Sequence, residues 1–357
     1  MPNRYARHLA LPGFGPAEQL QLSKARVLVV GAGGLGCPAL LYLAAAGVGS
    51  LGILDPDTVS LSNLQRQILF RESDIGQPKA TLAARQIRAY NSEILVQSMV
   101  EQVHRNNVEA LLQDYDYVLD ATDNFPARYL LNDASVLFDK TYIYGSIHQF
   151  EGQVAVFNQL RKDGSRGPNY RDLFPVPPLP EAVPDCAAGG VLGILPGIIG
   201  TMQASETIKC ITGIGQSLNG QLWLFDAENM ISRKMDIPKR ADTSIQELID
   251  YDLFCGHTPL PEDHNLSAKQ IREWIQTSRP HRLIDVRSLE EYQEFHLEAE
   301  HLPLDQLTQH VPELINAPID IVFYCQSGQR SRKALELLFA HGRTKGLFHL
   351  KDGLSRF

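Results

Sequence analysis

The sequence predicts an α/β protein in which a domain built on a mainly parallel sheet is followed by a smaller α/β domain. Three observations favour this class. Apolar strand patterns alternate with helix patterns between residues 26 and 144, as they do in parallel sheets. The glycine-rich turn Gly31-Ala32-Gly33-Gly34-Leu35-Gly36 joins the first strand to its helix. Residues 238–263 are polar and hold Pro238, Pro259 and Pro261, which indicates a linker.

The first domain is placed at residues 1–240. Its strands are expected at 27–30, 51–54, 94–99, 117–120 and 142–144, and its helices at 37–46, 79–90, 107–112 and 128–139. Residues 153–158 and 221–226 resemble antiparallel strands and predict an antiparallel extension of the sheet. Residues 161–185 are rich in proline, glycine and charge, and we expect a long, mobile crossover that does not pack internally.

The linker is placed at residues 241–263 and the second domain at 264–357. In the second domain, helices are expected at 266–274 and 331–340, and strands at 282–286 and 319–324. About 95 residues are enough for one small domain.

Composition excludes several classes of protein. The net charge of −8 over 357 residues argues against a nucleic-acid partner, which needs a basic face. Residues 27–54 and 187–205 are uncharged and long enough to cross a membrane, but their glycines and prolines resolve them into strand, turn and helix segments. The N-terminus is charged and is not a signal peptide. We expect no membrane association.

The cysteines indicate a reducing compartment. They are five, with no C-x-x-C pair, which argues against a disulfide framework or a self-contained zinc site. We therefore expect a cytoplasmic protein. Cys37 and Cys210 face predicted apolar helices and are interpreted as packing residues.

The glycine-rich turn predicts a nucleotide site. Gly31, Gly33 and Gly36 have the G-x-G-x-x-G spacing, which brings backbone N–H groups and a helix N-terminus close to a phosphate. Asp55 ends the second strand, at the distance where a Rossmann fold places its ribose-binding acid. These residues alone leave open whether the ligand is a dinucleotide or ATP.

Polar residues further along the chain favour ATP. Three segments follow the carboxyl ends of predicted parallel strands or the loops just beyond them, where open α/β sheets bind ligands: Ser62-Asn63-Leu64-Gln65-Arg66, then Lys79, then Asp123-Asn124. Asp123 could hold Mg²⁺ through its oxygens, and Arg66 and Lys79 could neutralise charge on a phosphorus under attack. Taken singly, each of these charges is more often an ordinary surface residue, and a dehydrogenase would not need them.

Residues 1–240 resemble the MoeB/ThiF group of ubiquitin-activating-like adenylyltransferases. The resemblance rests on Asn3-Arg4-Tyr5-Ala6-Arg7-His8, the glycine-rich turn, Ser62-Asn63-Leu64-Gln65-Arg66-Gln67, Gly76-Gln77-Pro78-Lys79-Ala80 and Asp120-Ala121-Thr122-Asp123-Asn124. It implies that ATP and Mg²⁺ are bound by residues of these motifs and by Asp55. The implied set is Gly33, Gly34, Gly36, Asp55, Ser62, Asn63, Leu64, Gln65, Arg66, Lys79, Asp123 and Asn124.

The same resemblance implies partners. Arg7 would reach into the site of a partner subunit, which implies a homodimer. The substrate would be the C-terminal glycine of a small ubiquitin-fold sulfur-carrier protein ending in Gly-Gly, converted to an acyl-adenylate with release of pyrophosphate. Cys186 stands where related enzymes have a cysteine that in some members bonds covalently to the carrier, and a packing role is the alternative.

No structural zinc is predicted. Family members commonly carry one C-x-x-C at the place of Asn169 to Asp172 and a second at 252–255, and this chain retains only Cys255. One thiolate with an amide and two carboxylates is a poor structural zinc set.

The second domain has its own candidate site. Cys325 follows a strand and opens a helix in Cys325-Gln326-Ser327-Gly328-Gln329-Arg330, where backbone N–H groups and the charge of Arg330 favour the thiolate. This C-x-x-G-x-R loop, with Asp285-Val286-Arg287 upstream, resembles the rhodanese active site, which implies a persulfide on Cys325. A phosphatase would need C-x5-R, and position 331 is serine.

Together these features predict a bifunctional adenylyltransferase and sulfurtransferase. The activated carboxyl group of the carrier would accept sulfur from Cys325, loaded by a cysteine desulfurase or by thiosulfate, to give a thiocarboxylate in a molybdopterin, thiamine or tRNA-thiolation pathway. Two alternatives remain at this stage: an NAD-dependent oxidoreductase with an appended domain, and a non-catalytic scaffold that binds the carrier.

Overall fold

The structure, a computed structural model, describes residues 4–178, 190–240, 243–255 and 262–357. The chain forms two compact units, one made of residues 1–175 and 184–248 and the other of residues 176–183 and 249–357. Each unit contains its own sheet and its own hydrophobic core.

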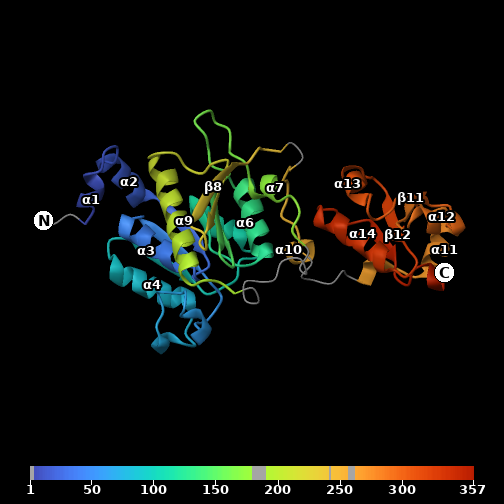
Figure 1. The fold of residues 1–357 in the computed structure, drawn as a ribbon, viewed down its shortest axis with the longest axis horizontal. Helices are drawn as coiled ribbons and strands as arrows, with labels where there is room; N and C mark the ends of the chain where they lie inside the picture. The colour runs from blue at the N-terminus through green and yellow to red at the C-terminus, as the bar shows by residue number, and fades with distance from the viewer. Residues whose placement is uncertain (1–3, 179–189, 241–242, 256–261) are drawn as a thin grey trace. The chain divides into compact units, whose positions relative to one another are not determined.

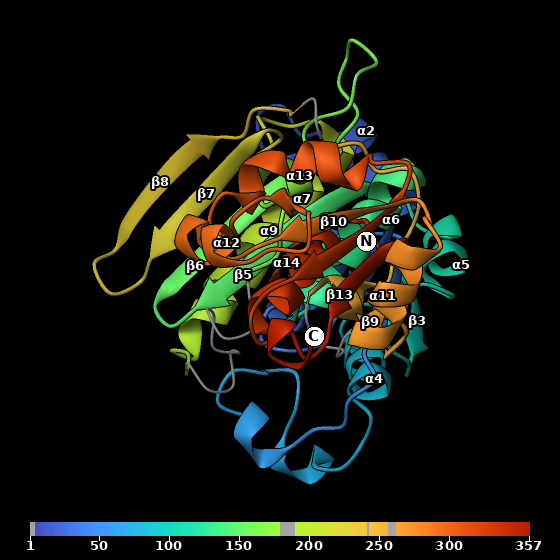
Figure 2. The same ribbon diagram turned by 90° about the vertical axis from the view of Figure 1, so that its right-hand side faces the viewer.

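The first unit is built on an eight-stranded sheet in the order β3-β2-β1-β4-β5-β6-β7-β8. The strands are β1 (Arg26–Val30), β2 (Ser50–Leu54), β3 (Leu95–Met99), β4 (Tyr117–Asp120), β5 (Thr141–His148), β6 (Glu151–Phe157), β7 (Gln221–Asp226) and β8 (Ile231–Asp236). The five neighbouring strands β3, β2, β1, β4 and β5 are parallel to one another. Beyond β5, the strands β6, β7 and β8 extend the sheet with antiparallel pairing (Figure 2). The predicted fold class is confirmed.

Helices cover both faces of this sheet. The bounds are α1 (Ala6–Leu9), α2 (Pro16–Lys24), α3 (Gly36–Ala46), α4 (Lys79–Tyr90), α5 (Val108–Gln113), α6 (Phe125–Leu137), α7 (Tyr170–Leu173) and α9 (Ile194–Thr212). Helices α3, α4 and α9 lie on one side of the strands and α6 on the other (Figure 1). Helix α9 packs closely on α3 because Gly200 has no side chain: a Cβ there would lie 2.1 Å from the carbonyl oxygen of Leu35.

The central strands are apolar because they are covered on both faces, as parallel strands are. The side chains of Val27, Leu28 and Val29 are fully buried, and β1 pairs with both β2 and β4. The two uncharged stretches weighed as membrane segments are therefore parts of this fold: the first forms β1, α3 and β2, and the second contributes the start of α9. Among the described residues, no helix is long and apolar enough to cross a membrane.

One sequence expectation for this unit was wrong, and one strand was not predicted. The described part of the 161–185 segment does pack: it contains α7, and Tyr170 is buried against Tyr129 and Phe157. Strand β8 was not predicted, since all six of its residues are exposed and its sequence lacks an apolar alternation.

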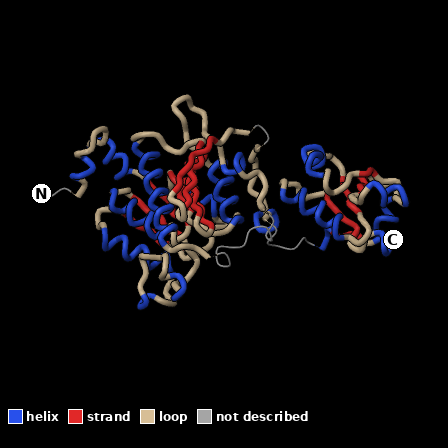
Figure 3. Tube along the Cα trace, in the orientation of Figure 1, coloured by secondary structure: helices blue, strands red, loops and turns tan. Residues whose placement is uncertain are grey.

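The second unit has a five-stranded parallel sheet in the order β11-β10-β12-β13-β9, seen with its flanking helices in Figure 3. Its strands are β9 (Asn265–Leu266), β10 (His281–Asp285), β11 (Glu300–His301), β12 (Asp320–Tyr324) and β13 (Leu347–Leu350). Its helices are α10 (Tyr251–Phe254), α11 (Ala268–Gln276), α12 (Leu289–Glu294), α13 (Leu307–Ile315) and α14 (Gln329–Ala340).

Candidate active sites

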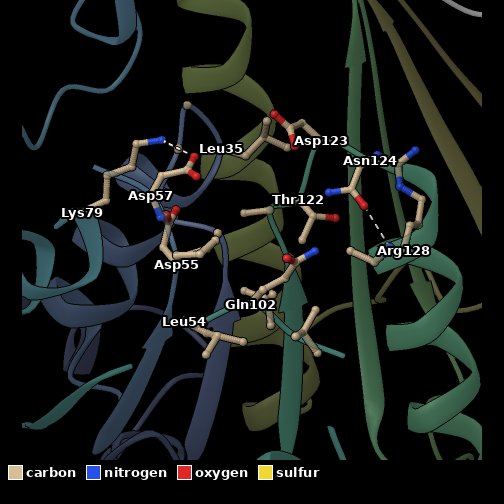
Figure 4. Close-up of a pocket in the computed structure, with 18 of the residues that line it drawn as sticks. Leu35, Leu54, Asp55, Asp57, Lys79, Gln102, Thr122, Asp123, Asn124 and Arg128 are labelled. Carbon is tan, nitrogen blue, oxygen red and sulfur yellow. Dashed lines mark hydrogen bonds and ion pairs between the residues drawn. The ribbon is translucent and has the colours of Figure 1, made fainter. Parts of the chain in front are cut away.

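A pocket of about 340 Å³ opens at the carboxyl ends of β1, β2 and β4 in the first unit. In the sheet, β1 lies between β2 and β4. The chain adds β2 and β3 on one side of β1 and β4 and β5 on the other, so the strand order reverses at β1. Ligands bind at such a point in open α/β sheets. In Figure 4, Asp55, Asp57 and Lys79 lie on one side of the pocket, and Thr122, Asp123, Asn124 and Arg128 lie on the other.

The glycine turn needs glycine for steric reasons. Gly31 has a φ of +99°, and a Cβ at this residue would lie 2.5 Å from the carbonyl oxygen of Ala121. A Cβ on Gly36 would lie 2.0 Å from the carbonyl oxygen of Gly31. The turn can therefore fold tightly between β1 and α3 only without side chains at these positions, and Gly33 and Gly34 are left lining the pocket.

Asp55 supports the turn from the end of β2. Its carboxylate is buried and accepts hydrogen bonds from the backbone N–H of Ala32 at 2.7 Å and of Asp57 at 2.8 Å. Burial raises the pKa of Asp55, and the two backbone hydrogen bonds oppose that rise. The residue is therefore placed both to hold the turn and to face the pocket.

Two predicted cations reach the pocket. Lys79 begins α4, is largely buried, and its Nζ lies 2.8 Å from Oδ2 of the more exposed Asp57. Arg66 also lines the pocket, and its Nη1 donates to the carbonyl oxygen of Ser62 at 3.0 Å. The sequence did not indicate Asp57, because it lies in an irregular loop with no pattern to mark it.

The residues after β4 complete the pocket. Asp123 is exposed, and Asn124 caps helix α6 by accepting from the N–H of Ala127 at 2.9 Å. The buried Arg128 extends from α6 and lies 3.7 Å from Asp120. Arg128 was missed by the sequence analysis, since nothing in a helical pattern separates a buried, paired arginine from a surface one.

Not every predicted site residue lines the pocket. Those that do are Gly33, Gly34, Asp55, Arg66, Lys79, Asp123 and Asn124, and those that do not are Arg7, Gly36, Ser62, Asn63, Leu64 and Gln65. Asn63 holds its own loop, with Oδ1 accepting from the N–H of Ser60 at 3.1 Å. Arg7 is exposed on α1. Cys186 lies outside the described residues.

The second site surrounds Cys325 at the end of β12. The cysteine is fully buried, and its Sγ accepts from the backbone N–H of Ser331 at 3.3 Å. Gly328 has a φ of +85°, and a Cβ there would lie 1.9 Å from the carbonyl oxygen of Lys351. The loop therefore packs closely against the residues that follow β13, and it leads directly into α14.

Two arginines lie beside this loop, and both are paired. Arg330 makes two hydrogen bonds to the Glu291 carboxylate, at 2.6 and 2.7 Å. The buried Arg287 pairs with Asp285 at 2.7 Å, and its Nη1 lies 3.5 Å from Oε1 of Gln326. The positive charge expected from Arg330 is thus offset by a carboxylate that the sequence did not indicate.

A buried histidine supports the loop from behind. Nδ1 of His349 lies 3.3 Å from Oγ of Ser331, and its Nε2 lies 2.7 Å from Oδ1 of Asn265. Burial, together with the positive charge of Arg332, lowers the pKa of His349 to about 4. The ring is therefore neutral near pH 7 and can accept the Ser331 hydroxyl proton in a hydrogen bond.

Two of the other described cysteines, Cys37 and Cys210, belong to or pack against the hydrophobic core of the first unit. Burial raises the pKa of Cys37 and of Cys210 to about 12, so both thiols stay protonated at neutral pH. Cys37 is fully buried and Cys210 half-buried, which agrees with the packing roles expected for them.

Asn169 and Asp172, at the place where family members commonly carry a C-x-x-C pair, are engaged in hydrogen bonds. Asp172 accepts from the N–H of Asn169 at 2.7 Å, from the N–H of Arg240 at 2.8 Å and from the hydroxyl of Thr243 at 2.6 Å. Among the residues that the structure describes, no group of three or more His, Cys, Asp or Glu side chains is arranged to hold a metal ion.

Two families match this chain. The ThiF family matches residues 5–246, and the rhodanese-like domain matches residues 267–357. The chain is similar to a protein of Mycobacterium tuberculosis named "Probable adenylyltransferase/sulfurtransferase MoeZ", with 44% identity over 98% of this chain and 91% of the relative. It is also similar to the "Sulfur carrier protein adenylyltransferase" of Thermus thermophilus, with 47% identity over 71% of this chain and 96% of the relative.

Solved structures share the fold of the first unit. The E. coli protein MccB superposes with a TM-score of 0.60 at 20% identity, covering 68% of this chain and 74% of MccB. The named relatives confirm the prediction of an enzyme that combines adenylyltransferase and sulfurtransferase activities.

Proposed function

This chain belongs to the ThiF family and carries a rhodanese-like domain after its adenylyltransferase domain; we propose that it activates a small sulfur-carrier protein with ATP and then transfers sulfur to it. The observation that carries the proposal is the pairing of two sites in one chain. One is a pocket lined by a glycine turn, by the cations Arg66, Lys79 and Arg128 and by an exposed carboxylate, and the other is the loop that begins at the buried Cys325.

In the adenylation step, the residues that line the pocket would have separate roles in binding ATP and in neutralising charge. Gly33 and Gly34 allow the phosphates to approach the backbone, and Asp55 holds the turn and faces the ribose. Lys79 and Arg66 neutralise the charge that develops when a carboxylate oxygen of the carrier attacks the α-phosphorus. The bond from that phosphorus to pyrophosphate breaks, which gives an acyl-adenylate.

The carboxylate of Asp123 fits a Mg²⁺ ion of the kind that proteins hold through one or two carboxylates while the substrate phosphates supply further ligands. Asp123 presents an exposed carboxylate at the pocket, and oxygen donors of this kind are the ligands that Mg²⁺ prefers. When bound there, the ion would offset phosphate charge. Asn124 borders the same space, while its amide oxygen caps α6.

In the sulfur-transfer step, the terminal sulfur of a Cys325 persulfide would attack the carbonyl carbon of the acyl-adenylate and displace AMP. In the resulting acyl disulfide, a thiolate then attacks Sγ of Cys325: the bond to the outer sulfur breaks, the thiocarboxylate of the carrier leaves with the electron pair, and Cys325 is left in a disulfide with the attacking thiol. A second thiol reduces this disulfide and so restores the Cys325 thiolate and the attacking thiol. Cys186 is proposed as a candidate for the attacking thiol. We further propose that the enzyme works as a homodimer in which Arg7 completes the partner's nucleotide site.

The experiment combines two measurements with purified full-length protein. With a carrier ending in Gly-Gly, ATP–pyrophosphate exchange is expected, and none is expected when the terminal glycine is removed. After incubation with ATP and a sulfur source, mass spectrometry of the carrier should show one sulfur in place of one oxygen. Absence of exchange with every small ubiquitin-fold protein of the same genome would contradict the adenylation proposal.

A further inference from the structure

The charges beside Cys325 are balanced. Two arginines contact or belong to the loop, and each forms a close pair with a carboxylate: Arg287 with Asp285 and Arg330 with Glu291. A loop that carried two unpaired arginines would attract small anions strongly. With both pairs formed, these two arginines offer a small dianion little net positive charge.

Of the two ion pairs, the one between Arg330 and Glu291 is accessible to a solute. The Asp285 pair is buried, whereas the side chains of Arg330 and Glu291 are 38% and 32% exposed, so a solute can reach the second pair. Glu291 lies on α12 and is also held by the N–H of Ser288 at 3.1 Å. The hydrogen bonds from Arg330 lower the pKa of Glu291 to about 2, so the carboxylate remains charged at any physiological pH.

We propose that Glu291 is a specificity-determining residue of the sulfurtransferase site, which occupies the guanidinium of Arg330 and thereby discriminates against small dianionic sulfur donors. An incoming dianion must either displace the carboxylate from the two hydrogen bonds or bind beside a neutralised arginine. This inference rests on the proposed role of Cys325 as the sulfur acceptor.

The step affected is the loading of Cys325. With thiosulfate, the thiolate attacks the outer sulfur, a bond forms between that sulfur and Sγ, and the bond to the sulfonate sulfur breaks. Sulfite leaves with the electron pair, and the cysteine becomes a persulfide. Cyanide then removes the outer sulfur as thiocyanate and restores the thiolate, so kcat/KM for the donor reports loading alone.

The test compares donors of different charge on the full chain. Glu291→Gln is expected to raise kcat/KM for thiosulfate, a dianion, by about tenfold at low salt, mainly through a lower KM. For methanethiosulfonate, a monoanion, the same substitution should give about a threefold rise, since the electrostatic gain scales with donor charge. Added salt should reduce both gains.

Two variants serve as matched controls. Glu290→Gln removes the same charge from the neighbouring position of α12 without touching Arg330, and should change either constant by less than about twofold. Glu291→Asp keeps the charge and should stay near the parent enzyme. A fall in thiosulfate activity in Glu291→Gln, or an equal rise in Glu290→Gln, overturns the proposal. Sulfur transfer that survives Cys325→Ala overturns instead the proposed function of the cysteine.

Discussion

Each unit of this protein places a tight turn between a parallel strand and a helix, but the two turns work differently. The turn after β1, Gly31–Gly36, has no functional side chain of its own and borders an open pocket. The loop after β12, Cys325–Arg330, carries its own thiol and closes over it so completely that Cys325 is buried. Both need glycine where a Cβ would meet a carbonyl oxygen at about 2 Å, at Gly36 and at Gly328.

The difference decides where the chemistry comes from. The glycine turn makes room, so the groups that act on a ligand must come from other segments, such as Asp55, Lys79 and Asp123. In the proposed function the cysteine loop contains its own reactive atom, so neighbouring segments would only tune it, as we propose for Glu291, or support it, as His349 does through Ser331. Single substitutions around the first turn should therefore lower the rate of adenylation by different amounts, whereas sulfur transfer at the second site should depend on the Cys325 sulfur alone.

The largest expected effect is that of Cys325→Ala. Because no other described thiol lies in this loop, sulfur transfer from thiosulfate to cyanide should fall by at least about a thousandfold. ATP–pyrophosphate exchange with the carrier should be unchanged. If exchange fell in parallel in a folded variant, the two sites would not be chemically separate.

The next largest effect concerns the first site, where a substitution should reduce ATP–pyrophosphate exchange and leave sulfur transfer unchanged. Lys79→Ala removes a buried cation from the pocket and should lower ATP–pyrophosphate exchange by about 100- to 1000-fold, while sulfur transfer stays intact. Lys24→Ala, which removes the same charge from the end of α2, is the control and should leave exchange unchanged. An exchange rate within threefold of the parent would remove Lys79 from the mechanism.

The same difference explains what the sequence could and could not predict. The cysteine loop is one contiguous motif, so Cys325 and Arg330 could be found from it, whereas Glu291 could not, since it lies 39 positions before Arg330. In the first unit, the glycine turn, Asp55 and Asp123 follow predicted strands, and Lys79 follows the loop beyond one of them, so all four could be placed at one sheet edge. Arg128 could not, because its partner Asp120 is known only once α6 is packed against β4.

The core elements were predicted by their apolar patterns, and the errors occurred where the pattern is absent. Strand β8 is exposed along its whole length, and its pairing with β7 is backbone hydrogen bonding that no apolar period records. The buried Tyr170 lies in a segment whose prolines and charges suggested an unpacked loop. Its burial depends on side chains from β6 and α6, which a local pattern cannot show.

A smaller effect concerns the support beneath the cysteine loop. His349 has its pKa lowered to about 4 by burial, whereas the unfolded chain has a histidine pKa near 6.5. The unfolded state therefore binds the proton more tightly. The contribution of neutral His349 to the free energy of unfolding is fully present above about pH 6.5. It is lost as the pH falls towards 4, and the total loss is about 3 kcal/mol.

Urea unfolding followed between pH 7 and pH 4 measures this loss. His349→Asn retains a hydrogen-bond acceptor near Ser331 and cannot be protonated, so its stability should fall less steeply over the same range. Parallel curves for the two proteins would show that another group is responsible. His310→Gln is the control, since His310 is exposed on α13 and makes no contribution to the lowered pKa of His349.

The smallest effect concerns the support beneath the glycine turn. Asp55 accepts two backbone N–H groups, from Ala32 and Asp57, and Asp55→Asn leaves only one oxygen to accept them. The loss of one hydrogen bond to a partly desolvated carboxylate should cost about 1–2 kcal/mol of unfolding free energy. The same substitution should weaken ATP binding by about tenfold, measured by calorimetry, because the turn loses its anchor and the ribose a carboxylate. Since burial raises the pKa of Asp55 and so penalises its charged form, a stability loss well above this range would mean that the two hydrogen bonds outweigh the burial of the charge.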